Sequence, residues 1–217
     1  MTHGLSMMIW KVLGVLALLG GLAGTSQAQV SMRRVLMSMP DSMAPYLNHS
    51  MMGELVEFAE RSGSAEVKNK LEGTTSLDTL TAEYASLSLS QVVRMEVLLL
   101  QRALGDTILC VVNTYRGPEP ESTVRFFDAT WQSLPGDALL SPVGLGALLH
   151  RPDTMSVEEY QRLCRMVDPC LIAVSVNPGD KGLTFSLSKP LLSKEDKQAL
   201  DAIVLQKYVK WDGITFK

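Results

Sequence analysis

The sequence predicts an α+β protein: an antiparallel sheet built on a four-strand meander, helices packed on one face, and a smaller second half of helices and hairpins. Apolar residues in the middle of the chain recur at every second position, which is the period of a β-strand. The strand segments are joined by turns too short for the crossovers that parallel strands need. Helical segments come in blocks, rather than after each strand, and this order favours α+β over doubly wound α/β.

Residues 1–28 are interpreted as a cleavable export signal. Lys11 gives the segment its positive charge, residues 12–23 follow without a charge, and Ser26-Gln27-Ala28 places small residues before a cut after Ala28. The apolar run is too short to cross about 30 Å of hydrocarbon as a helix, so cleavage is favoured over an uncleaved anchor. We therefore expect an exported protein.

Residues 29–217 are long enough to bury a substantial core, and we expect them to form a single exported domain. A division into sub-halves 29–134 and 135–217 is the alternative. The formal net charge of −3 becomes −4 without the leader, whose one charged residue is Lys11. This mild acidity, with no basic tract, argues against nucleic acid and anionic membrane surfaces as partners. No apolar stretch after residue 28 is long enough for a stable transmembrane segment.

The first half is predicted to be a helix followed by the four strands. Ser50 is expected to cap a helix over residues 51–62, which Gly63 ends. The period then changes to two, and a bulge near Ala85-Ser86 reconciles the two apolar faces of the first strand. The strands are predicted over residues 80–89, 93–99, 107–116 and 122–130.

The second half is predicted to alternate helices with hairpins. Residues 139–150 are apolar and are expected to be helical, although Pro142 lies among them. Ser156 and Glu159 form the pattern of a capping box that opens the next helix. The remaining elements are a hairpin of residues 171–177 and 183–188, a helix from Ser193 to Val204, and a final hairpin of residues 206–211 and 214–217 around Asp212-Gly213.

Three cysteines follow the leader. Cys164 and Cys170 flank Pro169 and can come within disulfide range, about 4.4–6.8 Å between Cα atoms. The alternative is that both stay free, as buried cysteines usually do, and Cys110 is expected to pack in the core. Zinc-ligand spacings and glycine-rich nucleotide loops are missing from the sequence, so it predicts no metal and no cofactor.

The sequence predicts no catalytic residue. It lacks the Gly-x-Ser-x-Gly pattern of hydrolases. His49 and His150 are the only histidines after the leader, so a nucleophile–histidine pair would have to use one of them. His49 is expected in a solvated loop, and His150 is expected to interact with carbonyl groups at a helix end.

Four residues near the end of the meander are candidates for a binding surface. Tyr115, Phe127 and Trp131 are a candidate aromatic recognition patch, and core packing is the alternative, because aromatic residues dominate the buried area in either case. Asp128 is a candidate binding carboxylate, and an outward-facing solvated residue is the alternative.

Methionines crowd the start of the chain after the leader. Their side chains are flexible and polarisable, so they are a candidate adaptable binding surface, with core filler as the alternative. The residues are Met32, Met37, Met39, Met43, Met51 and Met52.

Three stretches carry a resemblance to a known family: residues 39–47 (MPDSMAPYL), 77–81 (LDTLT) and 126–131 (FFDATW). Together they resemble an uncharacterised family of exported proteins from Bacteroidales bacteria, known as a domain of unknown function. The similarity covers most of the chain after the leader. It implies a periplasmic or envelope location and names no catalytic residue.

The lineage implied by this resemblance gives one sequence pattern a further meaning. Bacteria of this group attach O-glycans at Asp-Ser or Asp-Thr followed by an apolar residue. Ordinary turn chemistry, in which Asp precedes Ser or Thr where loops begin, is the alternative. Ser42 and Thr154 are the best candidates because they fall in predicted loops. The matching positions are Ser42, Thr79, Thr107 and Thr154.

These observations leave three functional hypotheses. The leading one is a non-enzymatic exported module whose sheet face or edge binds another, unknown envelope protein. The second is a periplasmic carrier of a lipid or other apolar ligand, because Leu98-Leu99-Leu100 is apolar on both faces of its strand. The third is a hydrolase with an unrecognised site, which would need His49 or His150 beside a Ser, Cys or carboxylate.

Overall fold

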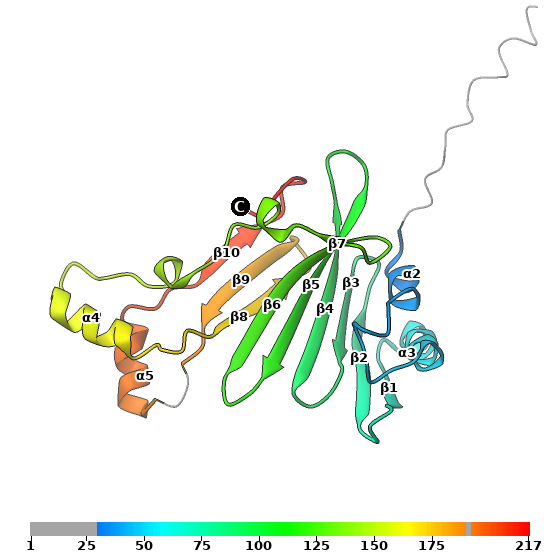
Figure 1. Ribbon diagram of the computed structural model, residues 1–217, viewed down its shortest axis with the longest axis horizontal. Helices are drawn as coiled ribbons and strands as arrows, with labels where there is room; N and C mark the ends of the chain where they lie inside the picture. The colour runs from blue at the N-terminus through cyan, green and yellow to red at the C-terminus, as the bar shows by residue number, and fades with distance from the viewer. Residues whose placement is uncertain (1–29, 190–191) are drawn as a thin grey trace, which may run out of the picture.

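The protein is an α+β structure with two antiparallel sheets (Figure 1). The computed structural model describes residues 30–189 and 192–217, so the predicted leader lies outside the described residues. Seven strands form the main sheet in chain order, which is a pure meander, and three strands form a small sheet in the order β10-β9-β8. The predicted fold class is therefore confirmed. In the described part of the chain, no helix has both the length and the apolar character needed to cross a membrane.

The elements follow one another in two groups. The first group consists of two helices and the main sheet: α2 (Met32–Met37), α3 (His49–Ser62), β1 (Ala65–Lys68), β2 (Thr74–Leu80), β3 (Tyr84–Ser88), β4 (Val93–Gln101), β5 (Thr107–Arg116), β6 (Pro120–Asp128) and β7 (Ser133–Leu134). The second group contains two 3₁₀ turns, two helices and the small sheet: η1 (Gly136–Ala138), η2 (Leu145–Ala147), α4 (Val157–Arg165), β8 (Ile172–Asn177), β9 (Gly182–Leu187), α5 (Lys194–Asp201) and β10 (Lys207–Lys210).

Helix α3 is capped two residues earlier than the sequence pattern predicts. The Asn48 side chain, rather than that of Ser50, accepts a hydrogen bond from the Met51 N–H, at 2.9 Å. Asn is as good an N-cap as Ser, and the choice of Asn48 brings His49 and Ser50 into the helix. At the other end Gly63 has φ +85°, the left-handed conformation of a helix C-cap, as expected.

The first predicted strand is two strands in the structure. β2 ends at Leu80 and β3 begins at Tyr84, and the turn between them is closed by a hydrogen bond from the Thr81 N–H to the Tyr84 carbonyl, at 2.8 Å. The irregularity expected near Ala85-Ser86 lies instead in β2, between Leu77 and Thr79. The Thr81 side chain, which also accepts from the Tyr84 N–H, favours this turn over a continuous strand.

Both faces of the main sheet are covered, each by a different layer. In the register of β4 with β5, Leu98 pairs with Cys110 and Leu99 with Leu109. Leu99 and Leu109 belong to the first core, under α2 and α3. Leu98 and Cys110 belong to the second core, which the residues after 138 complete. The run that is apolar on both faces is therefore buried on both sides.

The second group of elements is joined to the main sheet by specific hydrogen bonds. The Val174 N–H of β8 donates to Ser122 Oγ of β6 at 2.9 Å, and Trp211 Nε1 donates to the Gln101 carbonyl at 2.8 Å. The Phe126 and Phe216 rings pack 6.1 Å apart between their centroids. Helices α4 and α5 lie together beside the small sheet, on the side away from α2 and α3 (Figure 1).

The predicted helix over residues 139–150 is wrong. The chain there forms an extended connection with the short turns η1 and η2. Pro142 removes a backbone donor that a helix would need, and the glycines at 144 and 146 weaken a helix further. The predicted hairpin of residues 171–177 and 183–188 is confirmed as β8 and β9, whereas β10 pairs with β9 and becomes the third strand of the small sheet.

Candidate functional site

The structure does not bring the predicted aromatic residues together as one surface patch. Phe127 and Trp131 are buried, with ring centroids 5.5 Å apart, and Trp131 Nε1 donates to the Val35 carbonyl at 3.0 Å. Tyr115 is half-exposed and lies at the opposite end of β5, because Leu109 is the residue that pairs with Phe127. Two of the three rings thus belong to the first core, as the alternative interpretation had it.

Asp128 builds the turn that follows β6. Its Oδ1 accepts hydrogen bonds from the Thr130 N–H at 2.8 Å, the Thr130 hydroxyl at 2.7 Å and the Gln132 N–H at 3.0 Å. Desolvation would raise the pKa of this carboxyl, but the hydrogen bonds from Thr130 and Gln132 together outweigh it and hold the pKa below its ordinary value. These hydrogen bonds fix the turn that contains Trp131, whose φ is +66°. The carboxylate therefore has a structural role in this turn.

Of the two alternatives for Cys164 and Cys170, a bridge or two free cysteines, the structure has the second, and all three cysteines are free thiols. Cys164 packs against the second core near the end of α4, whereas Cys170 is exposed beyond Pro169, so their side chains have different surroundings. Cys110 is fully buried, and burial first, then the charge of Glu96, raises the pKa of its thiol. A buried thiol of this kind stays protonated and is a poor nucleophile.

Both histidines are exposed, and among the described residues neither imidazole is hydrogen-bonded to a Ser, Cys or carboxylate side chain. His49 is exposed in the first turn of α3, and His150 is exposed after η2, where its N–H donates to the Ile203 carbonyl at 2.8 Å. Among the described residues, no three His, Cys, Asp or Glu side chains gather in the way that would hold a metal ion.

Glu96 is a buried carboxylate that the sequence patterns did not single out. Its Oε1 accepts a hydrogen bond from the Tyr84 hydroxyl at 2.6 Å and lies 3.5 Å from Arg94 Nη2. Burial, then the hydrogen bond to Glu96, raises the pKa of Tyr84 to about 12. Its place in the alternation could have indicated burial, because Glu96 lies on the same face of β4 as Leu98, which belongs to the second core. Its two partners stabilise the buried charge, which is a structural role.

The strongest candidate site is an apolar groove at one end of the main sheet. Two of its side chains are unusually exposed for their type: Leu104 is 86% exposed and Ile214 is 63% exposed. The groove has a volume of about 470 Å³. Three separate segments line it: Arg102, Ala103 and Leu104 from the β4–β5 turn, Leu134, Pro135, Ala138 and Leu139 from the chain around η1, and Gly213 and Ile214 near the C-terminus.

Local hydrogen bonds fix the two turns that carry the exposed side chains. The Asp212 carboxylate accepts from the Ile214 N–H at 2.9 Å and the Thr215 N–H at 2.8 Å, and it pairs with Lys217. The hydrogen bond from Lys217, then those from the backbone, lower the pKa of Asp212 to about 2. Ile214 is therefore presented by a turn of defined shape.

The β4–β5 turn is equally well defined. The Arg102 N–H donates to the Asp106 carbonyl at 2.8 Å, and the Arg102 guanidinium lies 3.4 Å from the Asp106 carboxylate. Leu104 stands between these two residues at the tip of the turn. The groove thus combines an apolar centre with an ion pair at its rim, which is the general arrangement of protein–protein interfaces.

The fold defines an α+β class in which a seven-stranded antiparallel meander carries helices on one face and a three-stranded sheet on the other. The chain belongs to DUF3256, a family described as "Protein of unknown function", which it matches over residues 24–216. The predicted resemblance to a family of unknown function is therefore confirmed.

One solved structure with the same fold is a domain of an uncharacterised protein from Porphyromonas gingivalis W83. It has a TM-score of 0.72 and 19% sequence identity, and the match covers 85% of this chain and 96% of that one. At this identity the likeness shows the fold alone, and it is the source of the link to Bacteroidales. A search of curated proteins returned no match.

Proposed function

We propose that this protein is a non-enzymatic, exported envelope protein that binds another protein through the apolar groove. The exposure of Leu104 and Ile214 carries the proposal, because large apolar side chains at the tips of two ordered turns are stabilised when a partner covers them. Burying each one contributes about 1.5–3 kcal/mol. The export signal expected in residues 1–28 supports an envelope location.

The groove suits a protein partner better than a stored lipid. It is lined by turns at the surface, rather than enclosed between the sheet and the helices, and the Arg102–Asp106 pair at its rim offers polar contacts. The carrier hypothesis rested on Leu98, Leu99 and Leu100. Each of these is at most 1% exposed, inside one of the two cores, so packing already accounts for them.

Site-specific photo-crosslinking in the native host tests the proposal. A photoreactive amino acid at position 104 or 214 is expected to capture the same partner protein. A matched control is position 71, because Leu71 is 69% exposed in the β1–β2 turn at the opposite end of the sheet. The absence of an adduct at 104 and 214, or equal capture at 71, would contradict it. A small apolar molecule found by native mass spectrometry of the purified protein would favour the carrier instead.

O-glycosylation is a second property proposed for the exported chain. Ser42 and Thr154 are exposed in loops, which supports them as acceptors. Thr79 and Thr107 are half-buried in strands, and the Thr107 hydroxyl donates to Gln101 Oε1 at 3.1 Å, so they are poorer acceptors. Intact mass of protein from the native host is expected to exceed the polypeptide mass, with the excess lost in Ser42→Ala/Thr154→Ala. A mass equal to the polypeptide alone would refute the modification.

A further inference from the structure

The first strand of the main sheet has an open outer edge. β1 pairs with β2 on one side, and in the described part of the chain no strand pairs with its other side. The Asn69 N–H donates to the Gly73 carbonyl at 2.9 Å, in continuation of the β1–β2 register. The backbone groups of an antiparallel strand point alternately to its two sides, so those of Glu66 and Lys68 point away from β2.

The next outward position along this edge is already occupied. The Lys70 N–H donates to the Tyr46 carbonyl at 2.9 Å, so the loop before α3 closes the edge beyond Lys68. Within residues 30–189 and 192–217, the outward N–H and C=O groups of Glu66 and Lys68 have no hydrogen-bond partner. These groups are therefore available to a strand of another molecule.

The exposed side chains of β1 are complementary in charge to a second copy of the same strand. Glu66 and Lys68 are exposed on the face of the sheet away from α3, whereas Val67 between them belongs to the first core. In an antiparallel pairing of two β1 strands centred on Val67, each Glu66 lies opposite Lys68 of the other copy. Opposite charges at facing positions stabilise strand pairing, and the twofold axis produces this pair twice.

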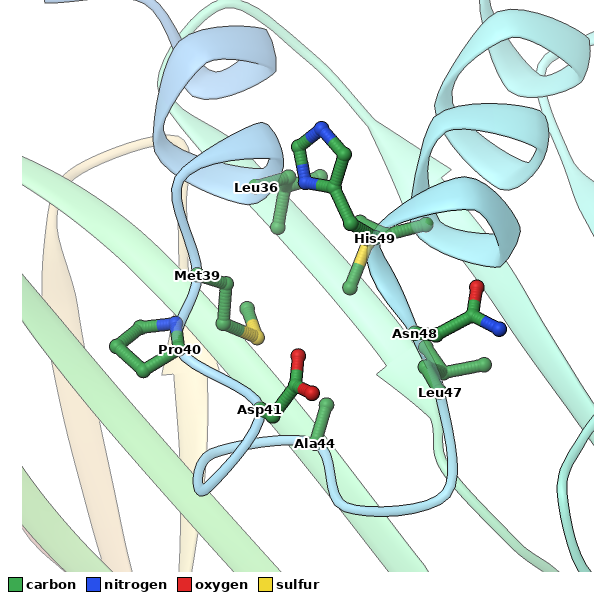
Figure 2. Close-up of a pocket in the computed structure, with 9 residues that line it drawn as sticks. Leu36, Met39, Pro40, Asp41, Ala44, Leu47, Asn48 and His49 are labelled. Atoms are coloured by element: carbon green, nitrogen blue, oxygen red, sulfur yellow. The ribbon is translucent and has the colours of Figure 1, made fainter.

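Helix α3 lies over this edge, with α2 along one of its flanks. α3 packs on β1 and β2. Arg33 of α2 pairs with Glu60, and at the other end Leu36 and His49 line a small hollow between the two helices (Figure 2). The Trp131 indole, which follows β6, donates to a carbonyl of α2, so α2 lies on the β6 side of α3.

Methionines fill the space between these helices and the sheet. All six that the sequence analysis singled out pack in the first core or against it. Met32 and Met52 are buried, and the other four are partly buried. Core filler, the alternative interpretation, therefore accounts for the clustering.

The flank of α3 that faces the β1 edge is uncharged and carries an exposed aromatic ring. Phe58 is 43% exposed and lies two residues before Glu60, about 200° around the helix from the α2 flank. Met51 and Ser62 are seven residues before and four residues after Phe58, so they share its side of the helix. This stripe gives the open edge an apolar neighbour.

We propose that two copies of this protein associate through β1 and α3 to form one continuous sheet. Strand pairing over so few residues is small beside the roughly 1,200 Å² that stable interfaces bury, so the helices must contribute. The twofold axis is perpendicular to the sheet and places both α3 helices on one face. Each lies about one strand spacing from the axis, so the helices are about 10 Å apart, close to the usual distance of packed helices. The Phe58 rings meet between them.

Charge reversal at the edge tests the proposal by analytical ultracentrifugation of the purified protein over a range of concentrations. Glu66→Lys and Lys68→Glu each place like charges at both facing positions, so each is expected to raise the dimer dissociation constant by about tenfold or more. Glu66→Lys/Lys68→Glu restores opposite charges and is expected to restore the wild-type constant. The two single variants, mixed, are expected to form a heterodimer.

Two controls separate this interface from other surfaces. Lys70→Glu makes the same change of charge where the proposed pairing brings an uncharged residue, Ser64, opposite, and it should leave the dissociation constant unchanged. Leu104→Asp/Ile214→Asp in the apolar groove should also leave it unchanged, so failure of this proposal is distinguishable from failure of the proposed function. Circular dichroism verifies that every variant is folded.

Amide exchange measured by NMR reports on the backbone pairing itself. The amides of Glu66 and Lys68 are expected to become protected as the concentration rises through the dissociation constant, whereas that of Val67, which points to β2, is protected throughout. A protein that stays monomeric at every concentration would overturn the proposal. So would a dimer that all three edge variants leave equally stable, or one that only the groove variant dissociates.

Discussion

Ala103 and Gly213 join two turns that are 110 residues apart in sequence: the Ala103 N–H donates to the Gly213 carbonyl at 2.9 Å. Gly213 has φ +95°, and a Cβ at this position would lie 3.9 Å from the Ala103 Cβ. This contact sets the β4–β5 turn beside the C-terminal turn. It therefore determines the distance between Leu104 and Ile214 across the apolar groove.

Replacing Gly213 is expected to disturb this contact. Gly213→Ala should lower the free energy of unfolding by about 1–2 kcal/mol, because an L-residue is strained at positive φ. Urea denaturation measures the change. Gly146→Ala in η2 is the control, since a Cβ there meets nothing within 4 Å, and its effect should stay within about 0.5 kcal/mol. Equal effects of the two substitutions would contradict the assigned strain.

Trp131 is expected to stabilise the fold through its indole N–H and its ring. Trp131→Phe removes the hydrogen bond to the Val35 carbonyl, which keeps a second donor, the Ser38 hydroxyl, at 3.2 Å. The lost bond and ring volume should together cost about 1–3 kcal/mol in urea denaturation. Phe58→Leu on the exposed side of α3 should cost much less. A Trp131→Phe protein as stable as the wild type would contradict the stabilising role assigned to the indole.

The buried Tyr84–Glu96 pair predicts a particular dependence of stability on pH. The folded pKa of Tyr84 is about 12, above the ordinary value of 10.0, so the folded state favours the protonated phenol. Its contribution is complete below pH 10 and is lost as the pH rises toward 12. Tyr84→Phe should destabilise the protein at pH 8, and its deficit relative to wild type should shrink above pH 10. A deficit independent of pH would contradict this pairing, and Tyr115→Phe is the control.

The three free thiols are expected to differ in reactivity. Cys170 is exposed and should react quickly with a thiol reagent in the native protein, whereas Cys110 should react after denaturation only. Cys164 is half-buried and should be intermediate. Mass spectrometry of the labelled protein counts the modified sites. Labelling of the denatured protein without reductant should modify all three cysteines. Labelling of Cys110 alone would show that Cys164 and Cys170 are bridged.

The main sheet could be predicted from the sequence where its strands are long. β4 is predicted by the alternation of Val93, Met95 and Val97 with charged residues, and β5 by a long apolar and β-branched run between two turn signals. β1 has only four residues, too few for a pattern to be recognised. Residues 139–150 are apolar but follow neither the helical nor the strand period. Their conformation is decided by Pro142 and by contacts with distant segments.

The apolar groove could be predicted only in part. A leucine at 104, before Gly105-Asp106, is an unusual residue for a hairpin turn, and the sequence contains that signal. Its neighbours Leu139 and Ile214 reach the same place through tertiary contacts such as the Ala103–Gly213 hydrogen bond, which no local pattern encodes. The aromatic residues were a poorer guide, because Phe127 and Trp131 are buried.

The affinity of the crosslinked partner for groove variants tests the central claim most directly. With purified partner, Leu104→Asp/Ile214→Asp is expected to raise the dissociation constant by at least about a hundredfold, since two buried apolar contacts become charged. Leu71→Asp, at the other end of the sheet, should leave it unchanged. If both variants bind the partner as tightly as the wild type, the apolar groove is not the binding site.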